Sequence, residues 1–379
     1  MSGIKNLDIL ACVVSQKVLQ RLWALGGKEY HWERTLAMSR AYARRLKREL
    51  AKKEYDLIVA DKGSVPIAHL DIDVPILYLS DATFRLTASY YCGYKNLCET
   101  TKRQGDLLER MAIRKAAVCL YRSEWAARSA IDDYGAEPSK VFVTSLGPAI
   151  DKQLIPPRID VADKLACGMC RLLLIGLDCR RKGCDTAIEA TRILKDEGID
   201  ARLTVCGCKI PAATTLPDYV TWVPFLNKND PDSMSTLADL YNETTIFLFP
   251  TRAEAYGIVL LEACAFGVPI VASNTGGIPE IVQHEKNGLL IDEIENPAAY
   301  AASIRRLFSD KKLYEQCAIG TRAVYEDKAN WRCWAGKVKE AIEKALSSSK
   351  ARSTCNAGIP RREGPPQVIA DRGASAGSS

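Results

Sequence analysis

The chain has 379 residues, of which 47% are hydrophobic and 26% charged, as in ordinary globular proteins. This length exceeds a single hydrophobic core, so two domains are expected. The net charge is +6, and the five basic and two acidic residues of the segment 347–379 supply half of it. Such a modest excess does not indicate a nucleic-acid partner. The apolar runs are too short for a membrane span or a convincing signal peptide, which favours a cytoplasmic location.

The fourteen cysteines are dispersed along the chain and do not form the framework of a small disulfide-rich protein. Three of them lie in apolar runs and are interpreted as small buried hydrophobic residues: Cys119, Cys206 and Cys264. Four cysteines could in principle hold zinc: Cys167, Cys170, Cys206 and Cys208. However, they contain only one C-x-x-C pair, and Cys206 falls inside a strand pattern. We therefore predict no metal site.

Residues 1–165 are predicted to form a first Rossmann-like domain. The evidence is a set of buried parallel strands separated by helices or loops, at residues 55–60, 74–79, 116–121 and 141–144. Asp81 follows the second strand, at the edge where such sheets bind their ligands, and is the side chain that we expect to face an acceptor. Asp71-Ile72-Asp73 has the spacing of a metal-binding D-x-D motif, but it precedes a strand and is interpreted as a loop.

The segment before Tyr55 does not clearly show the strand, glycine-bearing loop and helix that open a complete Rossmann-like domain. Two explanations stay open: the first domain is truncated, or residues 1–54 supply the opening unit in another form. Residues 35–54 predict an amphipathic helix whose polar face carries many Arg and Lys side chains. Such a face could make peripheral contact with an anionic membrane, although charged faces of this kind are usually only solvated.

Residues 166–330 are predicted to form a second Rossmann-like domain. Apolar runs indicate strands at 170–176, 201–207 and 219–225, and a helix covers 184–197. Between the first strand and this helix the chain carries Arg180, Arg181 and Lys182. These cations can neutralise a diphosphate leaving group without a metal ion. A solvated turn is the alternative interpretation of the same run.

The segment 245–291 predicts two further strands, at 245–250 and 268–273, each followed by a loop and a helix start. The first helix is expected at 257–266, and the second near Pro279, after the glycines of Thr275-Gly276-Gly277. In an open parallel sheet both loops lie at one edge. Free N–H groups and the positive ends of two helix dipoles would then suit a diphosphate.

Two glutamates bracket the first of these helix starts. Glu254 lies in the loop, where its carboxylate can accept hydrogen bonds from hydroxyls. Glu262 lies in the second turn of the helix, roughly 8 Å along from Gly257 at about 1.5 Å per residue. This separation suits a sugar at one end of a diphosphate and a ribose at the other, since both carry vicinal hydroxyls. The alternative is that Glu254 only favours the helix dipole and Glu262 is a surface charge.

The two glutamates belong to a series of motifs: E-A-Y-G-I-V-L-L-E, A-x-x-x-G-V-P-I-V-A-S, T-G-G-I-P-E-I-V and N-G-L-L. With these motifs in this order, the segment resembles the retaining glycosyltransferases of family 4, the glycosyl transferases group 1. The resemblance implies the GT-B fold, an α/β architecture of two Rossmann-like domains facing a cleft. It also implies metal-independent transfer of a hexose, with retention of configuration, from a nucleotide diphosphate sugar, and it requires no cofactor. The acceptor, whether a glycan, a lipid or a small molecule, stays open.

The resemblance also implies roles for individual residues. Glu254 would lie near the donor sugar, and with Arg181, Lys182 and Asp81 it forms the predicted catalytic set. Glu262 would bind the ribose. The other predicted donor-binding residues are Gly176, Arg180, Gly257, Ile258, Val259, Thr275, Gly276 and Gly277. Many relatives carry Arg where this chain has Leu177, so Arg180 or Arg181 must supply that guanidinium, and many place near Asp81 a histidine that this chain lacks.

Three further expectations complete the interpretation. Residues 331–346 should form a helix that returns to the first domain, as in the family, and the Ser-, Gly- and Pro-rich segment 347–379 should be disordered. Two alternatives to glycosyl transfer also stay open. One is a nucleotide-sugar epimerase on the same fold, and the other is a nucleotide-sugar-binding protein with little turnover.

Overall fold

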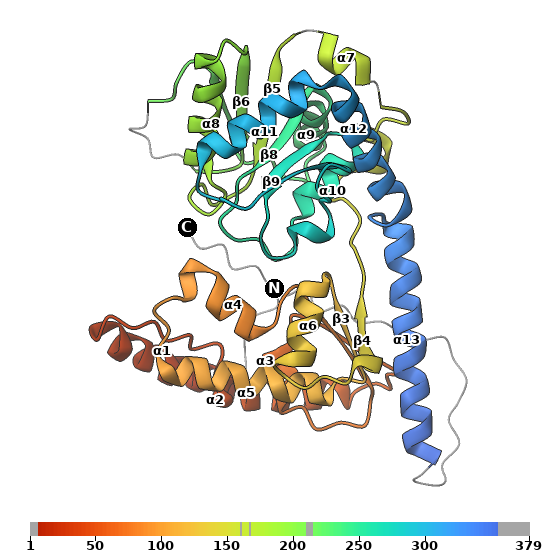
Figure 1. The fold of residues 1–379 in the computed structure, drawn as a ribbon. Coiled ribbons are helices and arrows are strands. Elements are labelled where there is room, and N and C mark those ends of the chain that lie inside the picture. Colours follow the sequence, from red (N-terminus) through yellow and green to blue (C-terminus); the bar gives the residue numbers. More distant parts are fainter. Residues whose placement is uncertain (1–6, 160, 167, 210–214, 355–379) are drawn as a thin grey trace. The chain divides into compact units, whose positions relative to one another are not determined.

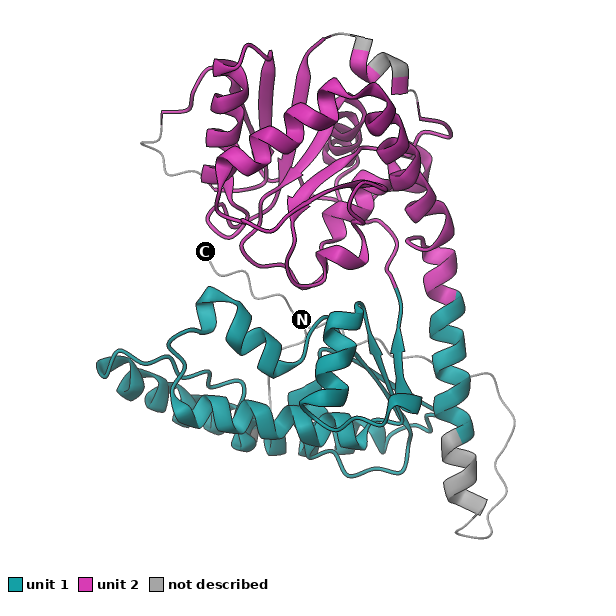
Figure 2. Ribbon diagram, viewed as in Figure 1, with its two compact units in different colours: residues 1–144, 336–379 teal, residues 145–335 magenta. Residues whose placement is uncertain are grey.

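The computed structural model describes residues 7–159, 161–166, 168–209 and 215–354. The chain divides into two compact units (Figure 2), which are described separately here. Unit 1 comprises residues up to Thr144 together with those from Gly336 onward, and unit 2 comprises Ser145–Ala335. Each unit is built on its own parallel sheet, which confirms the prediction of two Rossmann-like α/β domains.

Unit 1 has a four-stranded parallel sheet in the order β1-β2-β3-β4, and every strand was predicted from an apolar run. The strands are β1 (Ile58–Asp61), β2 (Ile76–Ser80), β3 (Val118–Tyr121) and β4 (Val141–Val143). The helices are α1 (Leu7–Leu25), α2 (Leu36–Leu50), α3 (Ser64–Ala68), α4 (Phe84–Tyr90), α5 (Glu99–Lys115) and α6 (Glu124–Asp132). Short 3-10 turns, η1 (Cys92–Tyr94) and η2 (Pro138–Lys140), complete the unit.

Both faces of the first sheet are covered, because successive side chains of a strand point to opposite faces. On one face Tyr78 and Tyr121 pack among α3, α5 and α6. On the other face Leu77 and Leu120 pack against Ala341 of α13 (Trp331–Thr354). The last helix that the structure describes therefore supplies one layer of unit 1.

The described residues before β1 form two helices, α1 and α2, and a loop whose Glu29 makes an isolated bridge with Leu97. The predicted basic helix is confirmed as α2, and the hydroxyl of Thr35 caps it by accepting the N–H of Met38. Between Leu7 and Leu57 the structure places no strand.

Unit 2 has a six-stranded parallel sheet in the order β10-β9-β8-β5-β6-β7. Its strands β6, β5, β8 and β9 are labelled in Figure 1. The strands are β5 (Cys170–Ile175), β6 (Ala201–Cys206), β7 (Val220–Val223), β8 (Ile246–Phe249), β9 (Ile270–Ser273) and β10 (Gly288–Ile291). The helices are α7 (Val161–Ala166), α8 (Cys184–Asp196), α9 (Pro231–Glu243), α10 (Ile258–Ala265), α11 (Pro297–Ser309) and α12 (Lys311–Asp327). The 3-10 turns are η3 (Lys152–Leu154) and η4 (Ile278–Glu280).

The second sheet is buried on both faces, which explains why its strands are continuous apolar runs in the sequence. Along β5, Leu172 and Leu174 point toward α8 and α11, while Leu173 points toward α9 and α10. Along β8, Leu248 and Phe249 divide between the same two layers. The loops at the carboxyl edge are thus fixed to a fully packed framework.

The boundary between the units differs from the predicted division at residue 165. Residues 145–159 belong to unit 2 because they are bonded to it: the Tyr256 hydroxyl accepts the Leu146 N–H at 3.1 Å, and the Trp331 indole donates to the Pro148 carbonyl at 3.0 Å. The helix α13 also continues to Thr354, into the segment predicted to be disordered. The rest of that segment, 355–379, lies outside the described residues.

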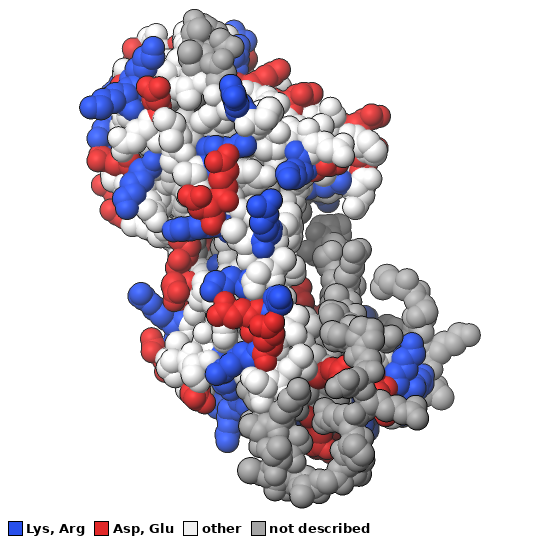
Figure 3. Space-filling model, turned by 90° about the vertical axis from the view of Figure 1, so that its right-hand side faces the viewer, with Lys and Arg blue, Asp and Glu red and all other residues white. Residues whose placement is uncertain are grey.

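The surface and the helices give two further observations. On the face shown in Figure 3, Lys and Arg side chains are interspersed with those of Asp and Glu. Among the described helices, none combines the length and the apolar composition that crossing a membrane requires.

Two helical glycines give a matched test of the packing. A Cβ on Gly320 of α12 would lie 2.1 Å from the Lys286 carbonyl oxygen, whereas a Cβ on Gly336 of α13 would meet no heavy atom within 4 Å. We expect Gly320→Ala to lower the free energy of unfolding by about 1–3 kcal/mol and Gly336→Ala to raise it by about 0.5–1 kcal/mol. Chemical unfolding curves of both variants check this, and destabilisation of similar size in both would contradict the packing described.

Candidate active site

The candidate site lies where the strand order of unit 2 changes direction. From β5 the chain proceeds outward to β6 and β7, then returns to place β8 on the other side of β5. The loops after β5 and β8 therefore diverge from neighbouring strands at the same carboxyl edge. Open α/β sheets bind their ligands at such a switch point.

The β5–α8 loop is shaped by a glycine and by its own hydrogen bonds. Gly183 has φ +70°, and a Cβ there would lie 2.0 Å from the Pro250 carbonyl oxygen. Within the loop, Asp178 Oδ1 accepts the backbone N–H of Arg181 at 3.0 Å. This loop can pack so closely on the end of β8 only because residue 183 has no side chain.

Arg252, which sequence reasoning missed, fastens the two loops to each other. Its backbone N–H donates to the Arg181 carbonyl at 2.8 Å, and its guanidinium binds both oxygens of Asp185 at 2.9 and 2.8 Å. Its Nε donates to Glu295 at 2.6 Å. The available signal was an arginine two residues after a buried strand, which by itself does not distinguish a structural clamp from a ligand-binding cation.

Three of the predicted catalytic residues meet at this point. Glu254 Oε2 lies 2.5 Å from Lys182 Nζ and 3.3 Å from Arg181 Nη1. Arg181 also donates to the Ala253 carbonyl at 2.9 Å. The side chains of Lys182 and Glu254 are only 7% and 15% exposed. The arrangement is a buried carboxylate held between two cations, rather than the solvated turn that was the alternative.

Lys182 owes its position to Gly176 and Phe249. A Cβ on Gly176 would lie 2.5 Å from the Lys182 side chain, so the lysine stem lies across this glycine. The ammonium lies 4.3 Å from the centre of the Phe249 ring, where the ring face attracts a cation. Gly176, predicted as a donor-binding residue, thus makes room for the cation.

Burial and charge act in opposite directions on this pair. Burial alone would raise the pKa of Glu254, but Lys182 and Arg181 outweigh it and hold that pKa below its usual value. Burial lowers the pKa of Lys182, and Glu254 offsets only part of this effect. An anionic ligand would add a second negative partner for Lys182 and favour its charged form.

Glu262 is not the exposed surface charge that the alternative interpretation assumed. Its side chain is fully buried, its Oε2 accepts the Tyr241 hydroxyl at 2.9 Å, and its Oε1 pairs with Lys228. Burial raises the pKa of Tyr241 well above its ordinary value, which keeps this hydroxyl a donor. Lys228, in the loop between β7 and α9, was not predicted because that loop shows no periodic pattern.

Gly257, Ile258 and Val259, predicted as donor-binding residues, lie at the start of α10. Gly257 has φ +94°, and a Cβ there would lie 2.9 Å from Leu260, so the loop turns directly into the helix. Ile258 and Val259 form the first helical positions. The N–H groups of a helix's first turn have no intrahelical acceptor, and they lie where the helix dipole is positive.

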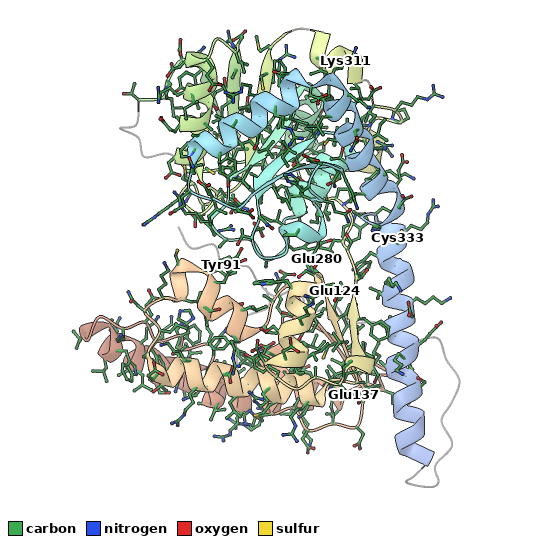
Figure 4. All side chains as sticks on the ribbon, viewed as in Figure 1. Tyr91, Glu124, Glu137, Glu280, Lys311 and Cys333 are labelled. Carbon is green, nitrogen blue, oxygen red and sulfur yellow. The ribbon has the colours of Figure 1, made fainter. Side chains whose placement is uncertain are left out.

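The loop after β9 differs from expectation. Gly276 has φ +56°, consistent with a tight turn, but the Gly277 N–H donates to the Glu254 carbonyl at 3.2 Å. The expected helix is only the 3-10 turn η4, whose Glu280 is labelled in Figure 4. The helix stops because Ile281 and Val282 turn into the core. A second helix dipole at this edge was therefore a wrong prediction.

Three other predicted site residues lie outside the Lys182–Glu254 contact. Arg180 is exposed, and its carbonyl accepts from Arg252 at 2.5 Å, so Arg181 is the arginine that contacts Glu254. Thr275 lies at the end of β9, where its N–H donates to the Ser273 carbonyl. Asp81 belongs to unit 1.

In unit 1, Asp81 occupies the predicted strand end but is not isolated. Lys62 Nζ lies 2.7 Å from its Oδ2, and Arg122 Nε lies 2.7 Å from its Oδ1. Arg122 also lies 3.8 Å from Asp61. The carboxyl ends of β1, β2 and β3 thus carry a compact group of opposite charges rather than a single acid.

The fold and the charge cluster define an α/β protein whose second sheet has the strand order of a doubly wound Rossmann-like domain. Comparisons with known proteins narrow the class of protein. Residues 171–324 match the family described as Glycosyl transferases group 1. A D-inositol 3-phosphate glycosyltransferase from Acidothermus cellulolyticus is 29% identical over 211 residues, 51% of this chain and 46% of that protein. One from Corynebacterium efficiens is 26% identical over 328 residues, 82% and 74% of the two chains. The chain spans about half the length of the first curated relatives that it matches.

Solved structures identify the fold. Sucrose-phosphate synthase from Thermosynechococcus elongatus has a TM-score of 0.62 at 20% identity, covering 84% of this chain and 78% of that one. HepE from Anabaena in complex with UDP has a TM-score of 0.59 at 17% identity, covering 82% of each chain. The architecture is the GT-B fold, and residues 171–324 are the part of the chain that matches the Glycosyl transferases group 1 family.

The charge cluster predicts how Glu254 titrates. Its pKa lies below the usual value, so the carboxylate stabilises the fold above about pH 4.5 and this contribution is lost as pH falls through the folded pKa. Lys182→Met removes the closest cation and leaves burial in place, so the pKa of Glu254 should rise. NMR titration of its carboxyl carbon measures this. Arg192→Met, which removes the partner of exposed Glu189, should leave Glu254 unchanged, and equal behaviour of the two variants would contradict the coupling.

Proposed function

We propose that this chain is a retaining glycosyltransferase that moves a hexose from a nucleotide diphosphate sugar to an acceptor without a metal ion. The observation that carries the proposal is the buried Lys182–Glu254 pair, joined by Arg181, at the switch point of the second sheet. HepE, a protein with the same fold, has been solved with UDP-glucose, which supports a donor of this class.

The two cations suit the leaving group. When the bond between the sugar and the diphosphate breaks, negative charge develops on the β-phosphate. Lys182 is nine-tenths buried, where a charge–charge attraction is stronger than in water. Arg181 and the first N–H groups of α10 add donors at the same edge. Each of these groups binds the departing phosphate more strongly than the intact donor, which is the condition for accelerating the step.

The phosphate can also act as the base. In a front-face substitution the acceptor attacks from the side of the leaving group, so retention follows, and the departing oxygen can take the acceptor proton. Glu254 would then orient the sugar by accepting hydrogen bonds from its hydroxyls. Its lowered pKa keeps it an acceptor at neutral pH.

Glu262 and Lys228 are assigned to the nucleoside end. Glu262 Oε2 is already bound to Tyr241, so the carboxylate is fixed in orientation. Lys228 is one-third exposed, and it can swing toward solvent and leave Oε1 to a ribose hydroxyl. We assign acceptor binding to unit 1, where Lys62 and Arg122 hold Asp81, and leave the acceptor class open among glycans, lipids and small molecules.

A donor screen tests the reaction. We expect the protein to hydrolyse or transfer from one of the UDP-, GDP- or ADP-sugars, with chelator present, and mass spectrometry should detect a glycosylated acceptor. Formation of an epimeric nucleotide sugar without an acceptor would instead indicate the epimerase. Tight binding with no turnover across the screen would indicate the binding protein.

Lys182→Met tests the leaving-group role. Losing a charge-assisted hydrogen bond costs about 1.5–3 kcal/mol, so donor cleavage should slow by roughly 10–150-fold. The matched control is Lys311→Met, because Lys311 is exposed at the start of α12, at the opposite end of unit 2 from Glu280 (Figure 4). Full activity in Lys182→Met, or loss of activity in the wild type on adding chelator, contradicts the metal-free scheme.

The two glutamates are tested as a pair. Glu262→Gln should weaken the binding of the free nucleotide, because it removes the acceptor for a ribose hydroxyl, while Glu254→Gln should leave that affinity nearly unchanged and reduce turnover. Calorimetry with the nucleotide alone and steady-state kinetics give the two readouts. If both variants lose nucleotide affinity equally, the division of roles is wrong.

A further inference from the structure

Three cysteines from separate elements converge beside the β5–α8 loop. The sulfur atoms of Cys179, Cys184 and Cys208 all lie within 4.8 Å of one another, and those of Cys184 and Cys208 are 3.5 Å apart. Across the residues that the structure describes, no other group of three or more His, Cys, Asp and Glu side chains brings its ligand atoms this close. Cys184 and Cys208 are buried, and Cys179 is partly exposed.

Backbone contacts bring these three thiols together. The Cys184 N–H donates to the Cys179 carbonyl at 3.0 Å, which closes the loop and brings the two residues to one side. Gly207 has φ +88°, and a Cβ there would lie 2.8 Å from the Gly176 carbonyl oxygen, so the chain leaving β6 passes directly beside the loop. Cys208 is carried into contact as a result.

Other buried cysteines show what packing alone produces. Cys206 lies two residues before Cys208, but it belongs to the opposite core layer and its thiol donates to the Pro224 carbonyl at 3.8 Å. Cys264 is buried in the same layer as Cys206. Neither belongs to a group of this kind within the described chain, so hydrophobic packing accounts for them and does not account for the convergence of three thiols.

We propose that Cys179, Cys184 and Cys208 form a binding site for one Zn²⁺ ion, with a fourth position open to water. Zinc–sulfur bonds of about 2.3 Å place tetrahedral sulfurs about 3.8 Å apart, so the observed separations need shifts of about an ångström at most. Cys184 is the first residue of α8, so the helix fixes the backbone of this ligand. The exposed side of Cys179 provides the entry route.

Zinc binding conserves protons and charge. The three thiols lose their protons to water as the ion enters, and three thiolates with Zn²⁺ give a centre of charge −1. No oxidant or reductant takes part. This set differs from the four cysteines considered from the sequence: it shares only Cys208 with them, and Cys167 lies outside the described residues. The ion would fasten the loop that carries Arg181 without using any group of the Lys182–Glu254 pair.

The test is zinc binding by the full chain, reduced and stripped with chelator. We expect one Zn²⁺ per chain that withstands competition with a chromogenic chelator, and Cd²⁺ should give a thiolate charge-transfer band in the ultraviolet. Cys179→Ser should weaken zinc affinity by at least about 10–100-fold, the loss found even for outer-shell partners. The matched control, Cys206→Ser, should retain the ion. Equal affinity in wild type and Cys179→Ser, or no retained zinc, overturns the proposal.

A second measurement does not depend on any variant folding. Alkylation of the wild-type chain, mapped by mass spectrometry, should label Cys179 readily without zinc and much more slowly with one equivalent, while exposed Cys92 should react equally in both. Unchanged labelling of Cys179 would count against the site. Recovery of Cys184 and Cys208 as a disulfide that persists under the reducing conditions would also overturn it. Glycosyl transfer is tested separately through Lys182, Glu254 and Glu262, none of which is a proposed zinc ligand.

Discussion

The second unit depends on one buried ion pair. Lys182 and Glu254 come from loops on two adjacent strands, and burial disfavours the charged form of each, which the other partner offsets. Removing one partner of a buried pair costs about 3–5 kcal/mol, since it leaves an uncompensated charge. The surrounding features serve this pair: Gly176 gives the lysine room, Phe249 faces its ammonium, and the backbone bond from Arg252 to Arg181 fixes the distance between the loops.

A pair of this kind is costly as a stability device but useful for binding a charged ligand. Well-packed apolar residues would stabilise the same position at least as well. A diphosphate, however, needs a cation that is dehydrated before the ligand arrives, and the carboxylate keeps Lys182 positive in a place where burial works against its charge. In the function proposed here, the phosphate would give the lysine a second acceptor, and the carboxylate would become freer to accept hydrogen bonds from sugar hydroxyls.

The sequence predicted the elements that follow from a local pattern, but it did not predict side-chain positions that depend on tertiary packing. All strands of both sheets except β10 were predicted, because double-sided burial makes them continuous apolar runs, as at β5 and β8. Lys182 and Glu254 were each predicted as site residues from their own loops, but their direct contact was not, because it depends on how β5 and β8 pair. Glu262 could not be placed, because α10 is buried on nearly every side and helical spacing then says nothing about exposure. Arg252 and Lys228 act through partners distant in the chain, which no local pattern reveals.

The division of the chain shows the same limit. The predicted boundary followed the onset of the first strand of the second sheet, yet residues 145–159 pack with unit 2 through hydrogen bonds to Tyr256 and Trp331. Conversely, α13 begins in unit 2 and completes unit 1 by covering Leu77 and Leu120. A strand pattern indicates where a sheet begins, whereas the boundary of a domain is set by its tertiary contacts. The connecting segment and the final helix therefore belong to the units that bury them, whatever their order in the sequence.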